Sequence, residues 1–302
     1  MAQLLHPAAL QNLELLARQV VEGFIIGLHK SPFHGFSVEF AEHRLYNVGD
    51  PLRHVDWKVY GRTDKLFVKR FEEETNLRCC LAIDVSSSMH FPQDKNRVSK
   101  LQFATVASAA LLQLLKRQLD ASALALFDEG LQTLTDCRSS HRHYRVLTAE
   151  LERLLSLTPE NRTTNAAAAL HEIADRLHQR SLVIIFTDGL ESGADADAFF
   201  AALQHLRHNK HEIILFHILD RSLEREFQFE NRPYEFVDLE SGEKLRIQPT
   251  QVREAYLSGM KAFEQDFEDR CHQYRIDRVS VDLTEPVETV LHAFLARRNK
   301  LL

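Results

Sequence analysis

The fold is decided by the stretch LAIDVSSSM, residues Leu81–Met89, in which an apolar strand ends in a carboxylate followed by hydroxyls. Asp84, Ser86 and Ser88 occupy alternate positions, so their side chains are expected to point the same way from one loop. This all-oxygen set of hard ligands suits Mg²⁺ better than zinc. The stretch therefore predicts a strand that delivers a metal site at its end.

A second apolar strand, Leu182–Phe186, ends in a similar way, in the sequence TDG at 187–189. Between the two strands, the polar turn Arg162–Asn165 opens an alanine-rich helix. In open α/β sheets, ligands bind beyond the carboxyl ends of the strands, where the strand order reverses. If the two strands are neighbours at that point, Asp84 and Asp188 face each other across a crevice.

From Arg78 onward, strand and helix patterns alternate, which indicates a mostly parallel sheet with helices on both faces. The turn at 128–130 joins two strands as a hairpin and makes the third strand antiparallel. A second hairpin is expected to pair Tyr234–Glu240 with Lys244–Ile247. The expected sheet strands are Arg78–Ile83, Ser122–Phe127, Leu131–Thr135, Leu182–Phe186, Glu212–Leu219 and Arg278–Leu283. The expected helices are Arg97–Arg117, Tyr144–Leu157, Asn165–Gln179, Asp195–Asn209, Thr250–Tyr274 and Pro286–Arg297.

The chain before Arg78 has a different character. Apolar residues at helical spacing predict an amphipathic helix over Gln11–Leu28. The segment Ser31–Leu77 mixes aromatic and charged residues with turn signals, so short strands and turns are expected there, with Trp57 in the core. We therefore predict an N-terminal helix and β-rich extension at residues 1–76, and an α/β domain at residues 77–302.

Composition excludes several classes of function. With 37 basic and 43 acidic residues, the 302-residue chain has a net charge of −6, which gives no sign of nucleic-acid binding. No apolar run is long enough to span a membrane. The four cysteines show no C-x-x-C spacing, as is usual for buried thiols in a reducing compartment. A cytoplasmic protein is expected.

Two sets of residues resemble known families. The first set resembles the metal-ion-dependent adhesion site of von Willebrand factor A domains, and the resemblance extends from about Leu77 to the C-terminus. Its five residues are Asp84, Ser86, Ser88, Thr164 and Asp188. Thr163 stands where many A domains have glycine, and Thr164, which precedes Asn165 and the helix, fits the metal threonine better.

The second set resembles the bacterial family called domain of unknown function 58. It comprises the pattern E-F-x-x-x-R-x-Y-x-x-G-D-x-x-R-x-x-D-W over Glu39–Trp57, followed by Arg62 and by Phe67-Val68-Lys69. Members of this family are similar to von Willebrand A domains and are typically linked with MoxR-type AAA ATPases.

Together, the resemblances imply a Mg²⁺ site, with Mn²⁺ or Ca²⁺ as other possible ions. Ser86 and Ser88 would bind the ion directly, Thr164 directly or through water, and Asp84 and Asp188 mainly through water. An open position on the ion would accept a carboxylate from a client protein. The implied function is a non-catalytic, metal-dependent interaction or adaptor protein that works with a MoxR-type AAA ATPase.

Two other functions are compatible with the same residues. A Mg²⁺-dependent phosphoester hydrolase would use the carboxylates to position metal and water. However, Ser86 occupies the position where haloacid dehalogenase phosphatases need a second aspartate, and the sequence contains no G-x-S-x-G elbow and no P-loop. A degenerate A domain that has lost its metal is the third reading.

Overall fold

The structure is a computed structural model that describes residues 13–25, 39–46, 55–72, 77–94, 96–156, 165–190 and 194–300. The chain divides into two compact units. Residues Met1–Pro32 and Arg78–Leu302 form the first, here called the α/β unit, and Phe33–Leu77 form the second, here called the extension. Each unit is described by itself.

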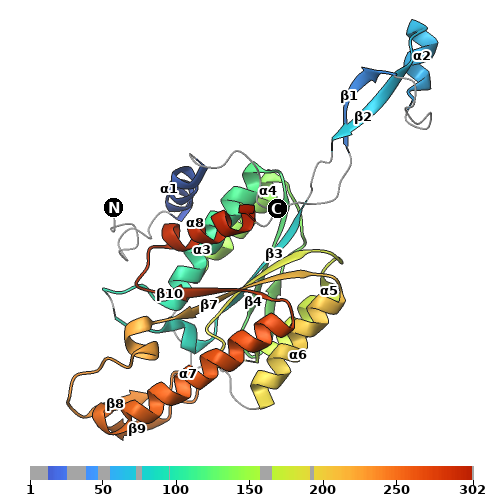
Figure 1. Ribbon diagram of the computed structural model, residues 1–302. Helices are drawn as coiled ribbons and strands as arrows, with labels where there is room; N and C mark the ends of the chain where they lie inside the picture. The colour runs from blue at the N-terminus through green and yellow to red at the C-terminus, as the bar shows by residue number, and fades with distance from the viewer. Residues whose placement is uncertain are drawn as a thin grey trace. The chain divides into compact units, whose positions relative to one another are not determined.

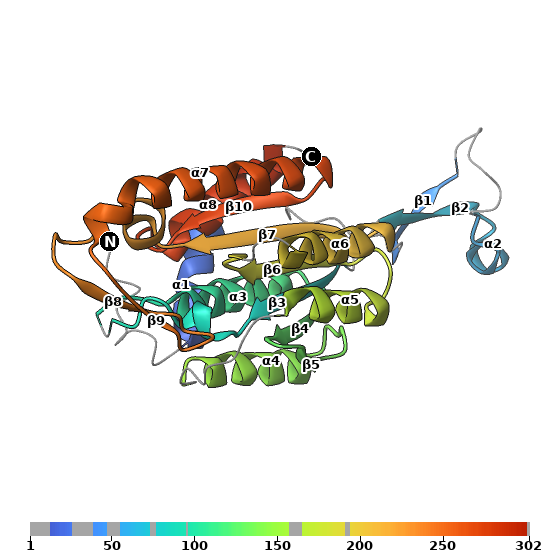
Figure 2. The ribbon, with the colours of Figure 1, turned by 90° about the horizontal axis from the view of Figure 1, so that it is seen from below.

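In the described part of the α/β unit, six strands form one sheet in the order β10-β7-β6-β3-β4-β5 (Figure 2). All neighbours are parallel except β5, which is antiparallel to β4. The strand order reverses between β3 and β6, which pair directly. The strands are β3 (Arg78–Asp84), β4 (Ala121–Phe127), β5 (Leu131–Leu134), β6 (Leu182–Thr187), β7 (Glu212–Leu219) and β10 (Asp277–Asp282).

Helices cover both faces of this sheet (Figures 1 and 2). One face packs against α5 (Ala166–Arg176), α6 (Ala194–His208) and α7 (Pro249–Gln273). The other packs against α3 (Lys100–Arg117), α4 (His141–Leu154) and α8 (Val287–Lys300). The predicted fold class, an α/β domain with a mostly parallel sheet and helices on both faces, is confirmed.

The central strands β3 and β6 are apolar between their ends because both of their faces are covered. Every residue of β6 is buried, and in β3 only Arg78 is exposed. Helix α3, which lies over these strands, begins at a capping box in which Ser99 and Gln102 exchange side-chain hydrogen bonds with each other's backbone N–H. The sheet and α3 together fix the positions from which the site residues project.

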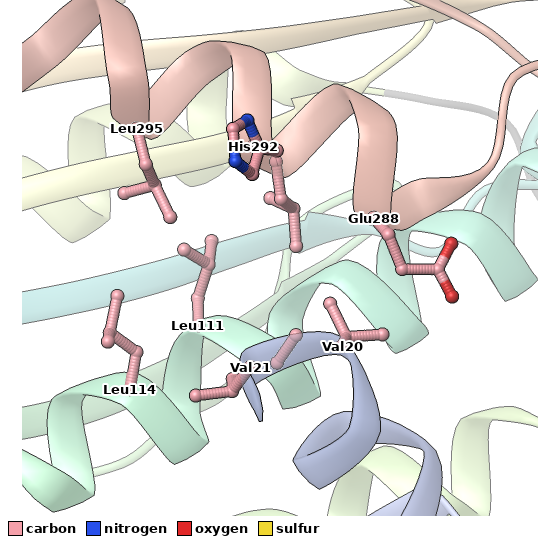
Figure 3. Close-up of a pocket in the computed structure, with 9 residues that line it drawn as sticks. Val20, Val21, Leu111, Leu114, Glu288, His292 and Leu295 are labelled. Atoms are coloured by element: carbon pink, nitrogen blue, oxygen red, sulfur yellow. The ribbon is translucent and has the colours of Figure 1, made fainter. Parts of the chain in front are cut away.

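Helix α1 (Leu13–Ile25) belongs to the α/β unit, where it packs against α3 and α8. The sequence pattern groups it instead with the extension, within residues 1–76. Figure 3 shows Val20 and Val21 of α1 facing Leu111 of α3 and Leu295 of α8. The space left between them is about 10 Å³, enough for at most one water molecule. The three helices are therefore closely packed.

The extension pairs β1 (Glu39–Leu45) with β2 (Phe67–Glu72) as antiparallel strands, and α2 (Trp57–Thr63) lies between them in the chain. The helix is a correction, because only strands and turns are expected here. Asp56 caps it by accepting hydrogen bonds from the backbone N–H groups of Lys58 and Val59. The expectation that Trp57 lies in the core is also wrong, since 60% of it is exposed.

The expected second hairpin is present, with β8 (Tyr234–Val237) antiparallel to β9 (Lys244–Ile247). No helix in the described ranges is both long and apolar enough to cross a membrane.

The burial of α1 predicts a sharp contrast between two adjacent leucines. Leu16 is 3% exposed and Leu15 is 52% exposed. We expect Leu16→Ala to lower the free energy of unfolding by about 2–5 kcal/mol and Leu15→Ala to change it by less than about 0.5 kcal/mol. Urea unfolding followed by far-ultraviolet circular dichroism measures both. Equal effects would contradict the packing of α1 on α3.

Candidate functional site

The end of β3 carries three of the residues that the sequence singles out. Asp84 is the last residue of this strand and is completely buried. Its Oδ1 accepts a hydrogen bond from the Ser86 backbone N–H at 3.0 Å, which holds the loop against the strand end. The Ser86 and Ser88 hydroxyls bond to each other, with their Oγ atoms 3.0 Å apart. The three side chains share one loop, and their role as metal ligands stays a prediction.

Thr187, the last residue of β6, ties this loop to the neighbouring strand. Its hydroxyl donates a hydrogen bond to Asp84 Oδ2 at 2.8 Å and accepts one from the Gly189 backbone N–H at 3.1 Å. Both oxygens of Asp84 are therefore held, one from each strand end.

Gly189 allows the β6 loop to pass close to helix α7. Its φ is +55°, a conformation that residues with a Cβ rarely adopt. A Cβ at this position would lie 3.1 Å from the Phe267 ring of α7. The glycine of the T-D-G sequence is thus favoured by its backbone conformation, and any larger residue would be crowded by the Phe267 ring.

Asp188 is brought to the same edge of the sheet as Asp84. It is 4% exposed, and its Oδ2 lies 2.8 Å from the Nζ of Lys100, the first residue of α3. Its backbone carbonyl accepts a hydrogen bond from His217 Nε2 at 2.7 Å, while an Arg278 N–H donates to His217 Nδ1. Burial and the Arg278 charge hold the pKa of His217 well below its usual value, so the imidazole is neutral.

Lys100 connects Asp188 to a further acid. Its ammonium lies 2.6 Å from Glu224 Oε1 on the short π-helix η4 (Arg221–Arg225), and the lysine is only 1% exposed. Burial alone would lower the pKa of Lys100, but the charges of Asp188 and Glu224 raise it above its usual value. Lys100 is therefore a buried permanent cation.

The surroundings of Asp84 destabilise the ionised form of its carboxyl group. Burial, followed by the negative charge of Asp188, raises the pKa of Asp84 to about 7, although hydrogen bonds from Ser86 and Thr187 act in the opposite direction. A divalent cation near both carboxylates would stabilise their ionised forms.

Thr164 lies outside the described residues, so the fifth predicted ligand has no position here. The residue that follows it is fixed. The Asn165 backbone N–H donates to the carbonyl of Asp128, just after β4, and the Asn165 side chain caps α5. The chain thus begins α5 with a hydrogen bond to the end of the strand next to β3.

The donor set fits Mg²⁺. With bonds of about 2.1 Å, adjacent oxygens of an octahedral Mg²⁺ complex lie about 3.0 Å apart. The Ser86 and Ser88 hydroxyls already have this separation. Across the described ranges, no group of three or more His, Cys, Asp and Glu side chains is arranged to hold a metal. The fit therefore depends on two hydroxyls, of Ser86 and Ser88, together with the carboxylates of Asp84 and Asp188. These are hard oxygen ligands of the kind that Mg²⁺ prefers.

Sequence reasoning missed Lys100 and Glu224. One signal was available for the lysine: it follows the N-cap Ser99, and a positive charge in the first turn of a helix is unfavourable because of the helix dipole. A lysine in this position needs a compensating partner. No comparable signal marks Glu224, which tertiary structure alone brings to the site.

Comparisons with known proteins give one family match. The pattern of a family described as "Protein of unknown function DUF58" matches residues 42–266. Uncharacterized proteins of Mycobacterium bovis and Mycobacterium tuberculosis are 26% identical over 183 residues, which is 61% of this chain. The match spans 57% of the length of those relatives.

Two solved structures show a limited likeness to this chain, each at 15% sequence identity. One is an aerotolerance-related membrane protein from Bacteroides fragilis, with a TM-score of 0.46, covering 73% of this chain and 99% of that one. The other is BatB from Bacteroides thetaiotaomicron, with a TM-score of 0.45, covering 74% and 99%. The α/β fold is identified from the strand order itself.

The role of Thr187 generates a prediction. Thr187→Val keeps the shape of the side chain but leaves a buried Asp84 oxygen and the Gly189 N–H without their partner. We expect the free energy of unfolding at pH 8 in EDTA to fall by about 1–3 kcal/mol. The matched control is Thr105→Val, which removes a buried hydroxyl bonded only to the carbonyl one helical turn before it. That control is expected to cost less than about 1 kcal/mol, and a loss as large as that of Thr187→Val would argue against a special role for Thr187.

Proposed function

Since this chain belongs to the DUF58 family, we propose that it is a non-catalytic, Mg²⁺-dependent interaction protein that works with a MoxR-type AAA ATPase in client remodelling or complex maturation. The observation that carries the metal dependence is the separation of 3.0 Å between the Ser86 and Ser88 hydroxyls, beside the buried carboxylates of Asp84 and Asp188. The family resemblance supports the proposed ATPase partner, and the composition supports the proposed cytoplasmic location.

Three residues at the end of β3 would have separate parts in this function. Ser86 and Ser88 would contact the ion through neutral hydroxyls. Asp84, already held by Ser86 N–H and Thr187, would orient bound water and supply charge. When bound, Mg²⁺ would offer an open coordination position to a carboxylate of a client protein. Because the hydroxyls of Ser86 and Ser88 are neutral, they would leave most of the ion's positive charge available to that carboxylate.

Metal binding is tested by Mg²⁺ addition. A ligand that binds only the folded state at 100 times its Kd stabilises that state by about 2.7 kcal/mol. We expect saturating Mg²⁺ to raise the melting temperature of the wild-type protein and to leave that of Ser86→Ala unchanged. Ser87→Ala is the matched control, because Ser87 is buried in the same loop but lies outside the D-x-S-x-S pattern, and it should retain the response. If Mg²⁺ does not change the melting temperature of the wild-type protein, the hypothesis of an A domain that has lost its metal is supported.

The interaction itself is tested by affinity capture with the MoxR-type ATPase of the same organism, with and without EDTA. We expect capture of the ATPase by the wild-type protein to depend on Mg²⁺, and we expect Asp84→Ala to lose this capture.

A parallel screen of phosphoesters tests for catalysis. Turnover that Asp188→Ala abolishes would favour the hydrolase over the adaptor.

A further inference from the structure

The proposed function leaves one feature unexplained. The buried Lys100 forms an ion pair with Asp188, a carboxylate that would otherwise be available to a metal. Lys100 Nζ lies 2.8 Å from Asp188 and 2.6 Å from Glu224, and 5.5 Å from the centre of the Phe91 ring. The side chain is 1% exposed. A cation is thus already built into the candidate metal site, at a position where helix α3 itself disfavours positive charge.

Hydrogen bonds hold Glu224 in place beside the Lys100 ammonium. Its Oε2 accepts a hydrogen bond from the Asp220 backbone N–H at 2.7 Å, and its carbonyl accepts one from the Tyr256 hydroxyl of α7 at 2.8 Å. Asp220, fully buried, is in turn bonded to Arg97 and to the Leu223 N–H. The ammonium therefore lies between two acids, of which only Asp188 belongs to the predicted metal set.

A fixed monovalent cation and a divalent ion near the same carboxylate repel each other, and the repulsion is strong where water is excluded. Lys100 cannot withdraw into solvent without leaving Glu224, whose side chain is only 13% exposed, without its charge partner, which is itself costly. The ion pair thus favours the state without a divalent ion.

We propose that Lys100 sets the metal affinity of this site by competing with Mg²⁺ for Asp188, so that the protein alone binds Mg²⁺ weakly. The inference rests on the proposed function and deepens it. A client carboxylate adds negative charge at the ion and offsets the ammonium. Because coupling between two ligands is reciprocal, metal and client then strengthen each other's binding. The site holds its metal firmly only when a client is present.

The test is calorimetric titration of Mg²⁺ alone into the wild-type protein, Lys100→Met and Lys116→Met. Lys116 is on the same helix, about 24 Å further along its axis, so its removal controls for the loss of one positive charge. We expect Lys100→Met to bind Mg²⁺ at least about tenfold more tightly than wild type, and Lys116→Met to stay within about twofold.

A second variant covers the case in which Lys100→Met does not fold. Lys100→Met/Glu224→Gln removes the ion pair as a whole, leaves no new unpaired acid at residue 224, and is also expected to bind Mg²⁺ more tightly than wild type. If the wild type binds Mg²⁺ and neither Lys100 variant binds it more tightly, the competition is refuted while the proposed function stands. If none of these proteins binds Mg²⁺, both are refuted.

Discussion

The parallel pairing of β3 with β6 is the constraint on which the site depends. The two strands run side by side from Cys79 and Leu182 to Ile83 and Phe186. Their register places Asp84, the last residue of β3, and Asp188, just after β6, at the same edge of the sheet. Thr187 then fastens one strand end to the other through the Asp84 carboxylate. A slip of one residue would turn Asp84 to the opposite face of the sheet and separate these groups.

Charge is concentrated at this edge in a way that the apolar sheet does not by itself explain. Asp84, Asp188 and Asp220 are all buried, and Lys100 is buried among them. Burying charged groups is costly unless each has a partner. Here most partners come from loops and from the first turn of α3. The buried strands hold these segments in place. The arrangement is typical of a site in which function, and not stability alone, accounts for the polar groups.

Much of the architecture could be predicted because periodic apolar patterns and turn signals agree along the chain. The strand Glu212–Leu219 has its expected bounds, and the T-D-G turn after β6 lies at the carboxyl end of its strand. The first failure was α2, a seven-residue helix whose start is marked only by the capping Asp56. Trp57 is expected in the core because tryptophan is highly buried on average, whereas here it lies on an exposed face of α2.

Some residues of the candidate site could likewise be predicted from the sequence and others could not. Residues on one strand end, such as Asp84 and Ser86, follow from local pattern. Contacts between segments far apart in the chain do not, because no local rule encodes the meeting of Lys100 with Glu224, 124 residues later. Thr164 stays a prediction, since it lies outside the described residues.

The exposure of Trp57 has a consequence for spectroscopy. It is the only tryptophan of the chain and belongs to the extension. Tryptophan emission therefore reports on the extension, whereas far-ultraviolet circular dichroism is dominated by the helices and sheet of the α/β unit. The two signals recorded on one sample separate the melting of the two units without any added label. A partner that covers α2 would be visible as a change in emission, independently of events at the candidate metal site.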